Sequence, residues 1–293
     1  MRCDLHVHSI ASGMDKTPNL GRLCRESYNQ PAEVYTRLKQ RGMSMVTLTD
    51  HDSIDAGEAL GKHADFFLSE EATVRMPGGT EMHLGVYGIT ERDHIEIQRR
   101  RKDFVSLMMY LTEKKLFFSV NHVFSSLTGR RLEEDFCWFA SYVPAFESRN
   151  GQMWRRANES AARLASRLGK IAIGGSDSHT IAGVGRTYTE VPGARTADEF
   201  FAGLRAGQGQ VHGAHGSYAK LTADVLRIVW LLWMEKPWTL ALMPLSLLVP
   251  AFTAGHWVNE IRFCQKWSTT VERGEKRQRM FWDVDSSFEA NWS

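Results

Sequence analysis

The sequence predicts an α/β fold in which a largely parallel sheet or barrel is followed by a helical tail. Short apolar runs alternate with helical stretches from the start of the chain to about residue 206, as in βαβ units. Histidine, aspartate or glutamate tends to follow each run, and the alternation stops after about residue 215. We therefore predict a catalytic module over residues 1–215 and a helical, hydrophobic extension over residues 216–293.

The individual elements follow from these runs. Strands are expected at residues 2–8, 43–51, 64–74, 82–89, 116–123, 142–150 and 170–179. Helices are expected at residues 31–42, 91–115, 131–140, 153–168 and 196–206, with a short helical piece between the second and third strands. Hydrophobic residues make up 43% of the 293 residues, which is enough for a sizeable core.

Charge and cysteine content limit the classes of function. The formal net charge is +2, with acidic and basic residues interspersed, so no nucleic-acid groove or polybasic arm is evident. The four cysteines show no CxxC spacing, which indicates reduced thiols in a cytoplasmic protein. The N-terminus lacks a long apolar segment, so we expect no secretory signal.

The extension contains an uncharged segment from Trp238 to Val258, 21 residues that are long enough to cross a bilayer as a helix. Pro244, Pro250 and His256 argue against a span. Two interpretations stay open: a membrane contact, by a span or an in-plane anchor, and a buried or partner-facing helical hairpin.

Polar side chains gather at the ends of the predicted strands. They are His6, His8, Asp50, His51, Glu70, Glu71, His122, Glu147, Asp177 and His179, whereas His83 stands at the start of its strand. The carboxyl ends of parallel strands meet at one edge, so these residues are expected to share a pocket. Two strand positions apart, His6 and His8 face the same side and can hold one metal ion. Gly174 and Gly175 would let the backbone turn closely around a ligand.

The motifs DLHVHS, TDHD, the Glu71 segment, NHV and GSDSH, in this order, resemble those of the polymerase and histidinol phosphatase (PHP) superfamily of metal-dependent phosphoesterases. The resemblance covers residues 3–191. It implies a distorted (β/α)7 barrel with two or three divalent ions, Zn, Mn or Fe, at the carboxyl ends of the strands.

The resemblance also implies a ligand set. His6, His8, Glu71 and Asp177 would hold one ion, and Glu71 would bridge to a second ion held by His83 and His122. His51 and His179 would bind a third. Glu71 fits better than Glu70 because Glu71-Ala-Thr matches the order of glutamate, small residue, serine or threonine in the family.

The sequence departs from the family after its first motif, where a histidine or aspartate commonly completes the third site. Gly13 and Met14 stand at that spacing, and Asp15 is the closest candidate. The insert at residues 16–30 would follow the first strand and could bind substrate.

The expected reaction is hydrolysis of a small phosphorylated substrate, because neighbouring metal ions activate water and neutralise a phosphoryl group. Asp50 or Asp52 would orient histidine ligands or cap a helix beginning at Ser53. His51 would be a ligand or the acid that protonates the leaving oxygen. Arg149 and Arg186 would bind phosphate or form surface salt bridges.

Three alternatives are weighed against this hypothesis. Amidohydrolases share the HxH opening but bridge their metals by a modified lysine, whereas Glu71 takes that role here. A nuclease would need a basic groove with aromatic platforms, which the predicted core lacks. A non-catalytic, membrane-associated or partner-binding module is disfavoured because nearly every ligand type is present.

Overall fold

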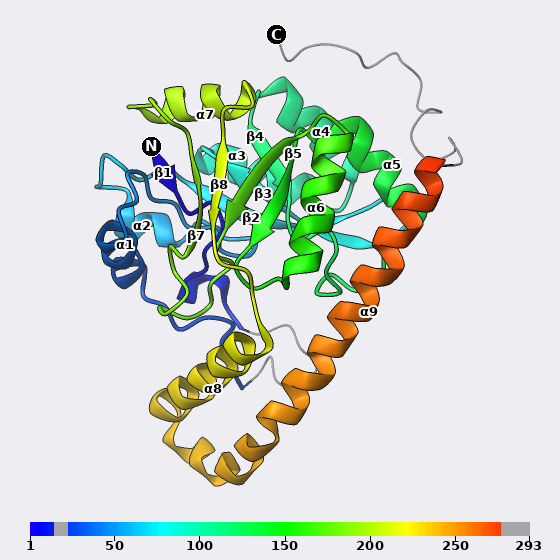
Figure 1. Ribbon diagram of the computed structural model, residues 1–293. Helices are drawn as coiled ribbons and strands as arrows, with labels where there is room; N and C mark the ends of the chain where they lie inside the picture. Colours follow the sequence, from blue (N-terminus) through cyan, green and yellow to red (C-terminus); the bar gives the residue numbers. More distant parts are fainter. Residues whose placement is uncertain (15–22, 277–293) are drawn as a thin grey trace.

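The computed structural model describes residues 1–14 and 23–276, so Asp15 lies outside the described residues. It is a mixed α/β structure whose strands form two sheets (Figure 1). A three-stranded sheet has the order β1 (Arg2–Cys3), β7 (Thr187–Glu190), β8 (Gln210–Gly213). A five-stranded sheet has the order β2 (Ser69–Arg75), β3 (Glu81–Tyr87), β4 (Phe117–Val120), β5 (Ala145–Asn150), β6 (Ile171–Gly175).

The prediction of a largely parallel sheet holds for only part of the larger sheet. Strands β4, β5 and β6 run parallel, but β3 is antiparallel to both β2 and β4. Residues 76–80, which join β2 to β3, are too few to form a parallel crossover. Strands β7 and β8, which the sequence analysis did not predict, form an antiparallel pair.

The (β/α)7 barrel is not confirmed, because no closed barrel forms among residues 1–14 and 23–276. The expected strands at 2–8 and 43–51 contact their neighbours mainly through single bridges, Val7 to Ser178, Val46 to Phe66 and His51 to Glu71. Between these bridges some amides donate to single backbone carbonyls, as Thr49 N does to Val7 O at 2.9 Å, and others donate to side chains. Val7 N, for example, donates to Thr49 Oγ1 at 3.0 Å.

Helices surround the sheets, with α7 beside the three-stranded sheet and α4, α5 and α6 beside the five-stranded one (Figure 1). Their bounds are η1 (Ile10–Ser12), α1 (Pro31–Gln40), α2 (Ala56–Leu60), α3 (Glu91–Arg100), α4 (Phe104–Glu113), α5 (Glu133–Tyr142), α6 (Arg155–Arg167) and α7 (Ala197–Arg205). The single helix expected at 91–115 is two helices, because Asp103 caps a new one by accepting from Ser106 N.

The largest apolar cluster lies between the five-stranded sheet and its helices. Phe118 and Phe146 of the sheet and Phe136 and Phe139 of α5 are completely or almost completely buried there. Trp267 packs against Phe136 with ring centroids 5.9 Å apart. The C-terminal region therefore contributes to the same core.

The chain ends in a helical hairpin formed by α8 (Tyr218–Glu235), η2 (Pro237–Leu248) and α9 (Val249–Lys276). In Figure 1 the hairpin projects from the body, and α9 returns along α5 and α6. Within the described ranges one helix, Pro237–Gly274, is long and apolar enough to cross a membrane, and its most apolar 18-residue window has a mean hydropathy of 1.5. Only 11% of its most apolar window is buried, so this part of the hairpin is not a core element.

The base of the hairpin is tied to residues 23–30. Arg25 Nε lies 2.6 Å from Glu235 Oε1, and Lys236 Nζ donates to Leu23 O at 2.8 Å. Residues 23–30 thus contact α8. The same segment also contacts His51 and His179 through Glu26.

Candidate metal centre

Histidine and acidic side chains from distant parts of the chain meet around the carboxyl ends of β4, β5 and β6. They are His6, His8, His51, Glu71, His83, His122, Asp177 and His179. His83 reaches this edge because β3 is antiparallel to β4, so the start of β3 lies beside the end of β4. The exceptional position of His83 in the sequence pattern therefore has a topological cause.

The first group of facing atoms consists of His6, His8, Glu71 and Asp177. His6 Nε2 lies 3.1 Å from His8 Nε2 and 3.2 Å from Glu71 Oε1. Asp177 Oδ1 lies 3.5 Å from His6 Nε2 and 3.4 Å from His8 Nε2. All four side chains are at most 5% exposed. Two nitrogens and two carboxylates converge on one buried point.

Glu71 also belongs to a second group, with His83 and His122. Glu71 Oε1 lies 3.2 Å from His122 Nε2 and 3.5 Å from His83 Nδ1. The other oxygen, Oε2, lies 3.4 Å from His8 Nε2 and 3.2 Å from His51 Nδ1. One carboxylate is therefore shared by several groups, which is the position of a bridging ligand.

The third group contains His8, His51 and His179, whose ligand atoms lie within 4.8 Å of one another. Glu26 joins it: its Oε1 is 3.1 Å from His51 Nε2 and 3.6 Å from His179 Nε2. The sequence analysis missed Glu26 because it lies in the insert, outside every motif. Glu26 follows no predicted strand and has no characteristic spacing from the other candidate ligands, so the sequence carries no signal for it.

Several polar atoms in this cluster are buried without a hydrogen bond to any described residue. They are His51 Nδ1, His83 Nδ1, His122 Nδ1 and Glu26 Oε2. Leaving such an atom unpaired costs about 1–3 kcal/mol, and a divalent cation would satisfy nitrogen and carboxylate donors together. A His and carboxylate set of this kind suits Zn, Mn or Fe.

The electrostatics of the cluster favour ionised carboxylates but neutral rings at only some of the histidines, because nearby carboxylates outweigh burial and raise the pKa of His6, His122 and His179. Burial lowers the pKa of His8 to about 3 and that of His83 to about 4. Burial also opposes ionisation of Glu71 and Asp177, but nearby histidines, His6 above all, outweigh it and hold both pKa values well below the usual range. Neutral imidazoles and ionised carboxylates are the forms that bind divalent ions.

Comparison with known proteins finds a family match over part of the chain and a similar fold in solved structures. The PHP_C model, described as PHP-associated, matches residues 155–208. A two-domain protein containing a predicted PHP-like metal-dependent phosphoesterase, from Bacteroides vulgatus ATCC 8482, has a similar fold. The likeness has a TM-score of 0.55 at 16% identity and covers 77% of this chain and 69% of that one. The family model covers only this part of the chain, and the structural likeness, at 16% identity, shows a shared fold.

A second solved structure also has a similar fold. PsfC from Pseudomonas syringae PB-5123 has a TM-score of 0.56 at 18% identity, covering 78% of this chain and 98% of that protein. No curated protein matches the chain. At these identities the likeness concerns the fold alone, so the chemistry of the site has to follow from its own residues.

Two carboxylates orient histidines of the cluster without belonging to it. His6 Nδ1 donates to Glu147 Oε1 at 2.9 Å, which leaves its Nε2 facing the cluster. Asp50 Oδ1 accepts from Ser12 Oγ at 2.7 Å, and that hydroxyl lies 3.0 Å from His8 Nδ1. Such partners fix the ring orientation and the tautomer of a ligand.

The backbone at two candidate ligands is in the left-handed region, with φ of 30° at His122 and 48° at Asp177. Such conformations cost about 1–3 kcal/mol each and are common at functional sites. The glycine pair has another role than the one expected. A Cβ at Gly175 would lie 2.3 Å from His6 N, so this glycine makes room for the first strand and not for a ligand.

Two predicted acidic candidates face away from the cluster. Glu70 Oε2 lies 3.0 Å from His94 Nδ1 on α3, the opposite direction to Glu71. Asp52 Oδ1 accepts from Thr73 N at 2.7 Å and its Oδ2 lies 3.3 Å from Arg101. Neither Asp50 nor Asp52 caps a helix at Ser53, since α2 begins at Ala56.

The predicted phosphate-binding arginines also lie apart. Arg149 Nη1 donates to Gly213 O at 3.2 Å, and the Arg186 side chain is exposed. Neither contacts the metal cluster among the described residues.

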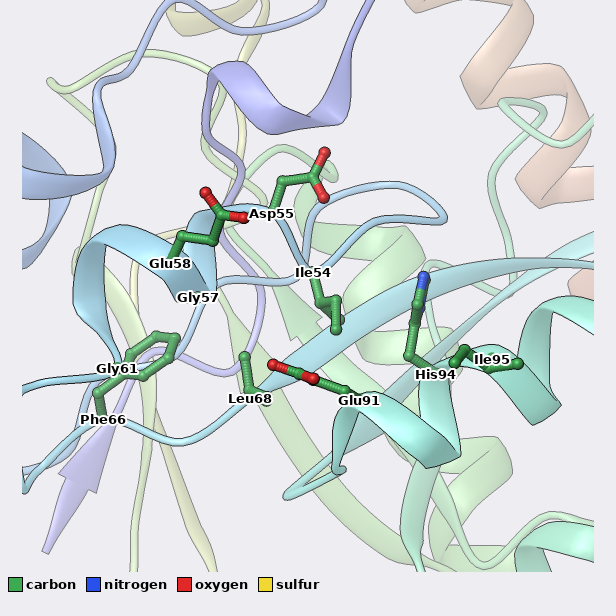
Figure 2. Close-up of a pocket in the computed structure, with 10 residues that line it drawn as sticks. All are labelled: Ile54, Asp55, Gly57, Glu58, Gly61, Phe66, Leu68, Glu91, His94 and Ile95. Carbon is green, nitrogen blue, oxygen red and sulfur yellow. The ribbon is translucent and has the colours of Figure 1, made fainter.

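Figure 2 shows a surface pocket of about 600 Å³ near α2 and α3. Its lining includes Phe66, Leu68 and His94 but none of the eight cluster residues. This pocket therefore does not mark the candidate metal centre.

Proposed function

We propose that this protein is a PHP-type metal-dependent phosphoesterase that hydrolyses a phosphomonoester or a small phosphodiester. The observation that carries the proposal is the shared carboxylate of Glu71, within 3.5 Å of ring nitrogens from His6, His8, His51, His83 and His122. A bridging carboxylate between histidine-rich groups is suited to holding neighbouring divalent ions for phosphoryl transfer.

The proposed ligands fall into three groups that follow the geometry. His6, His8, Glu71 and Asp177 would hold one ion. Glu71, His83 and His122 would hold a second ion. The third ion would be held by His51, His179 and Glu26, next to His8. Bound Zn, Mn or Fe would supply an activated water and charge neutralisation of the phosphoryl oxygens.

The protein's own residues would position this chemistry. Glu147 and Asp50, the latter through Ser12, hold the rings of His6 and His8 in the orientation described above. His179, Glu26 and His83 are the most exposed members, with side chains 20%, 22% and 14% accessible. We infer that the substrate approaches from their side, because the remaining rings are covered.

Elemental analysis of the purified protein, combined with hydrolysis of an aryl phosphate, tests the proposal. We expect two or more metal ions per chain and measurable hydrolysis, both reduced in His8→Ala. The matched control is His63→Ala, since His63 stacks on Tyr35 away from the cluster. A chain without bound metal and without activity after Mn or Zn is added would refute the proposal.

A separate prediction concerns Glu26. Glu26→Gln keeps the size of the side chain but removes the charge beside His51 and His179. We expect metal affinity at the third group to fall about 10- to 100-fold, as when a supporting ligand is lost, with the other two groups still loaded. Metal content after dialysis against a weak chelator measures this. Glu33→Gln, on the exposed first turn of α1, is the control. Equal metal retention in both variants would exclude Glu26 as a ligand.

A further inference from the structure

The apolar tip, which we define as residues 237–252, is the most exposed hydrophobic part of the molecule that the structure describes. Trp238 is 67% exposed, Leu245 59%, Leu247 82%, Leu248 60% and Phe252 62%. No aspartate, glutamate, lysine or arginine occurs from residue 237 to residue 259. Contiguous apolar surface of this kind marks an interaction site.

The exposed face continues along α8. Leu226, Trp230 and Met234 are spaced four residues apart, so they lie on one side of the helix. Their exposed fractions are 42%, 51% and 65%. The apolar surface therefore extends from the tip along one flank of the hairpin.

The charges around the tip fit an anionic surface. Residues 218–271 contain three acidic residues and five lysines and arginines. All three acids have partners: Asp224 with Thr180, Glu235 with Arg25, and Glu260 with Ser126. Within residues 218–271, Arg227, Arg262 and Lys266 are exposed, and the exposed acid Glu235 is paired with Arg25. Basic residues beside an apolar surface favour a membrane that carries anionic lipids.

The two ends of the hairpin attach to the same body. Thr180 Oγ1 donates to Asp224 Oδ1 of α8 at 2.6 Å. On α9, Cys264, Trp267 and Val271 belong to the main apolar cluster and are at most 6% exposed. The tip is thus entered and left from one side, as Figure 1 shows. A transmembrane span would have to pull the second half of α9 out of the core.

We propose that the apolar tip inserts into one leaflet of a lipid bilayer and anchors the protein without spanning the membrane. The chain enters and leaves from the same side, as in interfacial anchors. Tryptophan at the start of the tip suits the boundary between head groups and acyl chains. The inference concerns a partner surface and does not depend on the proposed hydrolysis.

Cosedimentation of the full-length protein with preformed vesicles tests the anchor. The vesicles contain phosphatidylcholine alone or mixed with phosphatidylglycerol. We expect wild type to bind the mixed vesicles, with the bound fraction falling as salt is added. The double variant Leu247→Glu/Leu248→Glu should bind at least tenfold more weakly, since both side chains are exposed and their replacement leaves the core intact. Met109→Glu, an equally exposed apolar position on α4, is the control and should bind like wild type.

Three results would overturn the proposal. Wild-type protein that stays in the supernatant with both kinds of vesicle has no membrane anchor. If sedimentation then shows that wild type is a dimer and the double variant is a monomer, the tip is a contact between two copies of the chain. If the C-terminal half of α9 is protected from protease added outside the vesicles, the apolar tip spans the bilayer. The His122→Ala variant, which removes a ligand of the second group only, should bind vesicles normally, and this separates anchoring from catalysis.

Discussion

Replacing Glu71 with glutamine is expected to abolish phosphoester hydrolysis and to remove more than one metal ion from each chain. The carboxylate faces ring nitrogens of five histidines at 3.2–3.5 Å. The amide has nearly the same size but no charge, so it cannot bridge two cations. We expect activity to fall by about 100-fold or more, beyond the effect of losing a group that only supports a ligand.

Glu70→Gln is the matched control for this substitution. Glu70 is the preceding residue and is equally buried, but it pairs with His94 on the other side of β2. Elemental analysis and steady-state kinetics of both variants provide the measurement. We expect wild-type metal content in Glu70→Gln and a loss of metal in Glu71→Gln. Full metal content in Glu71→Gln would contradict the bridging role.

Gly175→Ala is expected to destabilise the fold more than any substitution of a cluster residue. The new Cβ would lie 2.3 Å from His6 N and 2.4 Å from His6 Cβ, in the segment that follows β1. The backbone cannot move aside as a flexible side chain does, so we expect a loss of about 3 kcal/mol or more in the free energy of unfolding.

Urea unfolding of this variant beside Gly255→Ala provides the measurement. Gly255 lies within α9, and a Cβ there meets no atom within 4 Å. Alanine should therefore stabilise that helix by up to about 1 kcal/mol. Wild-type stability of Gly175→Ala would show that β6 and the first strand do not approach each other as closely as described.

The sequence predicted the strand ends at which most of the cluster lies, because an apolar run followed by histidine or aspartate has a local signature. It did not predict why His83 begins its strand, since that depends on β3 running antiparallel to β4. Strands β7 and β8 were missed because TYTE and QVHG are short and partly exposed, without a strong apolar pattern.

Long-range contacts explain the other differences. Glu26 reaches His51 and His179 only because residues 23–30 fold back over the cluster, which no spacing reveals. Likewise, the uncharged composition marked residues 238–258 as unusual. It could not show that Trp267, beyond them, packs into the main core and so brings the chain back to its starting side.

The connection between residues 23–30 and the base of the hairpin has a thermodynamic consequence. Arg25 pairs with Glu235 of α8, and its neighbour Glu26 contacts His51 and His179. If lipid binding shifts the hairpin, the same short segment changes the affinity of the third group for its ion. Linkage is reciprocal, so loading that group would alter lipid affinity by the same factor. Lipid binding and metal binding would then each change the affinity of the protein for the other ligand.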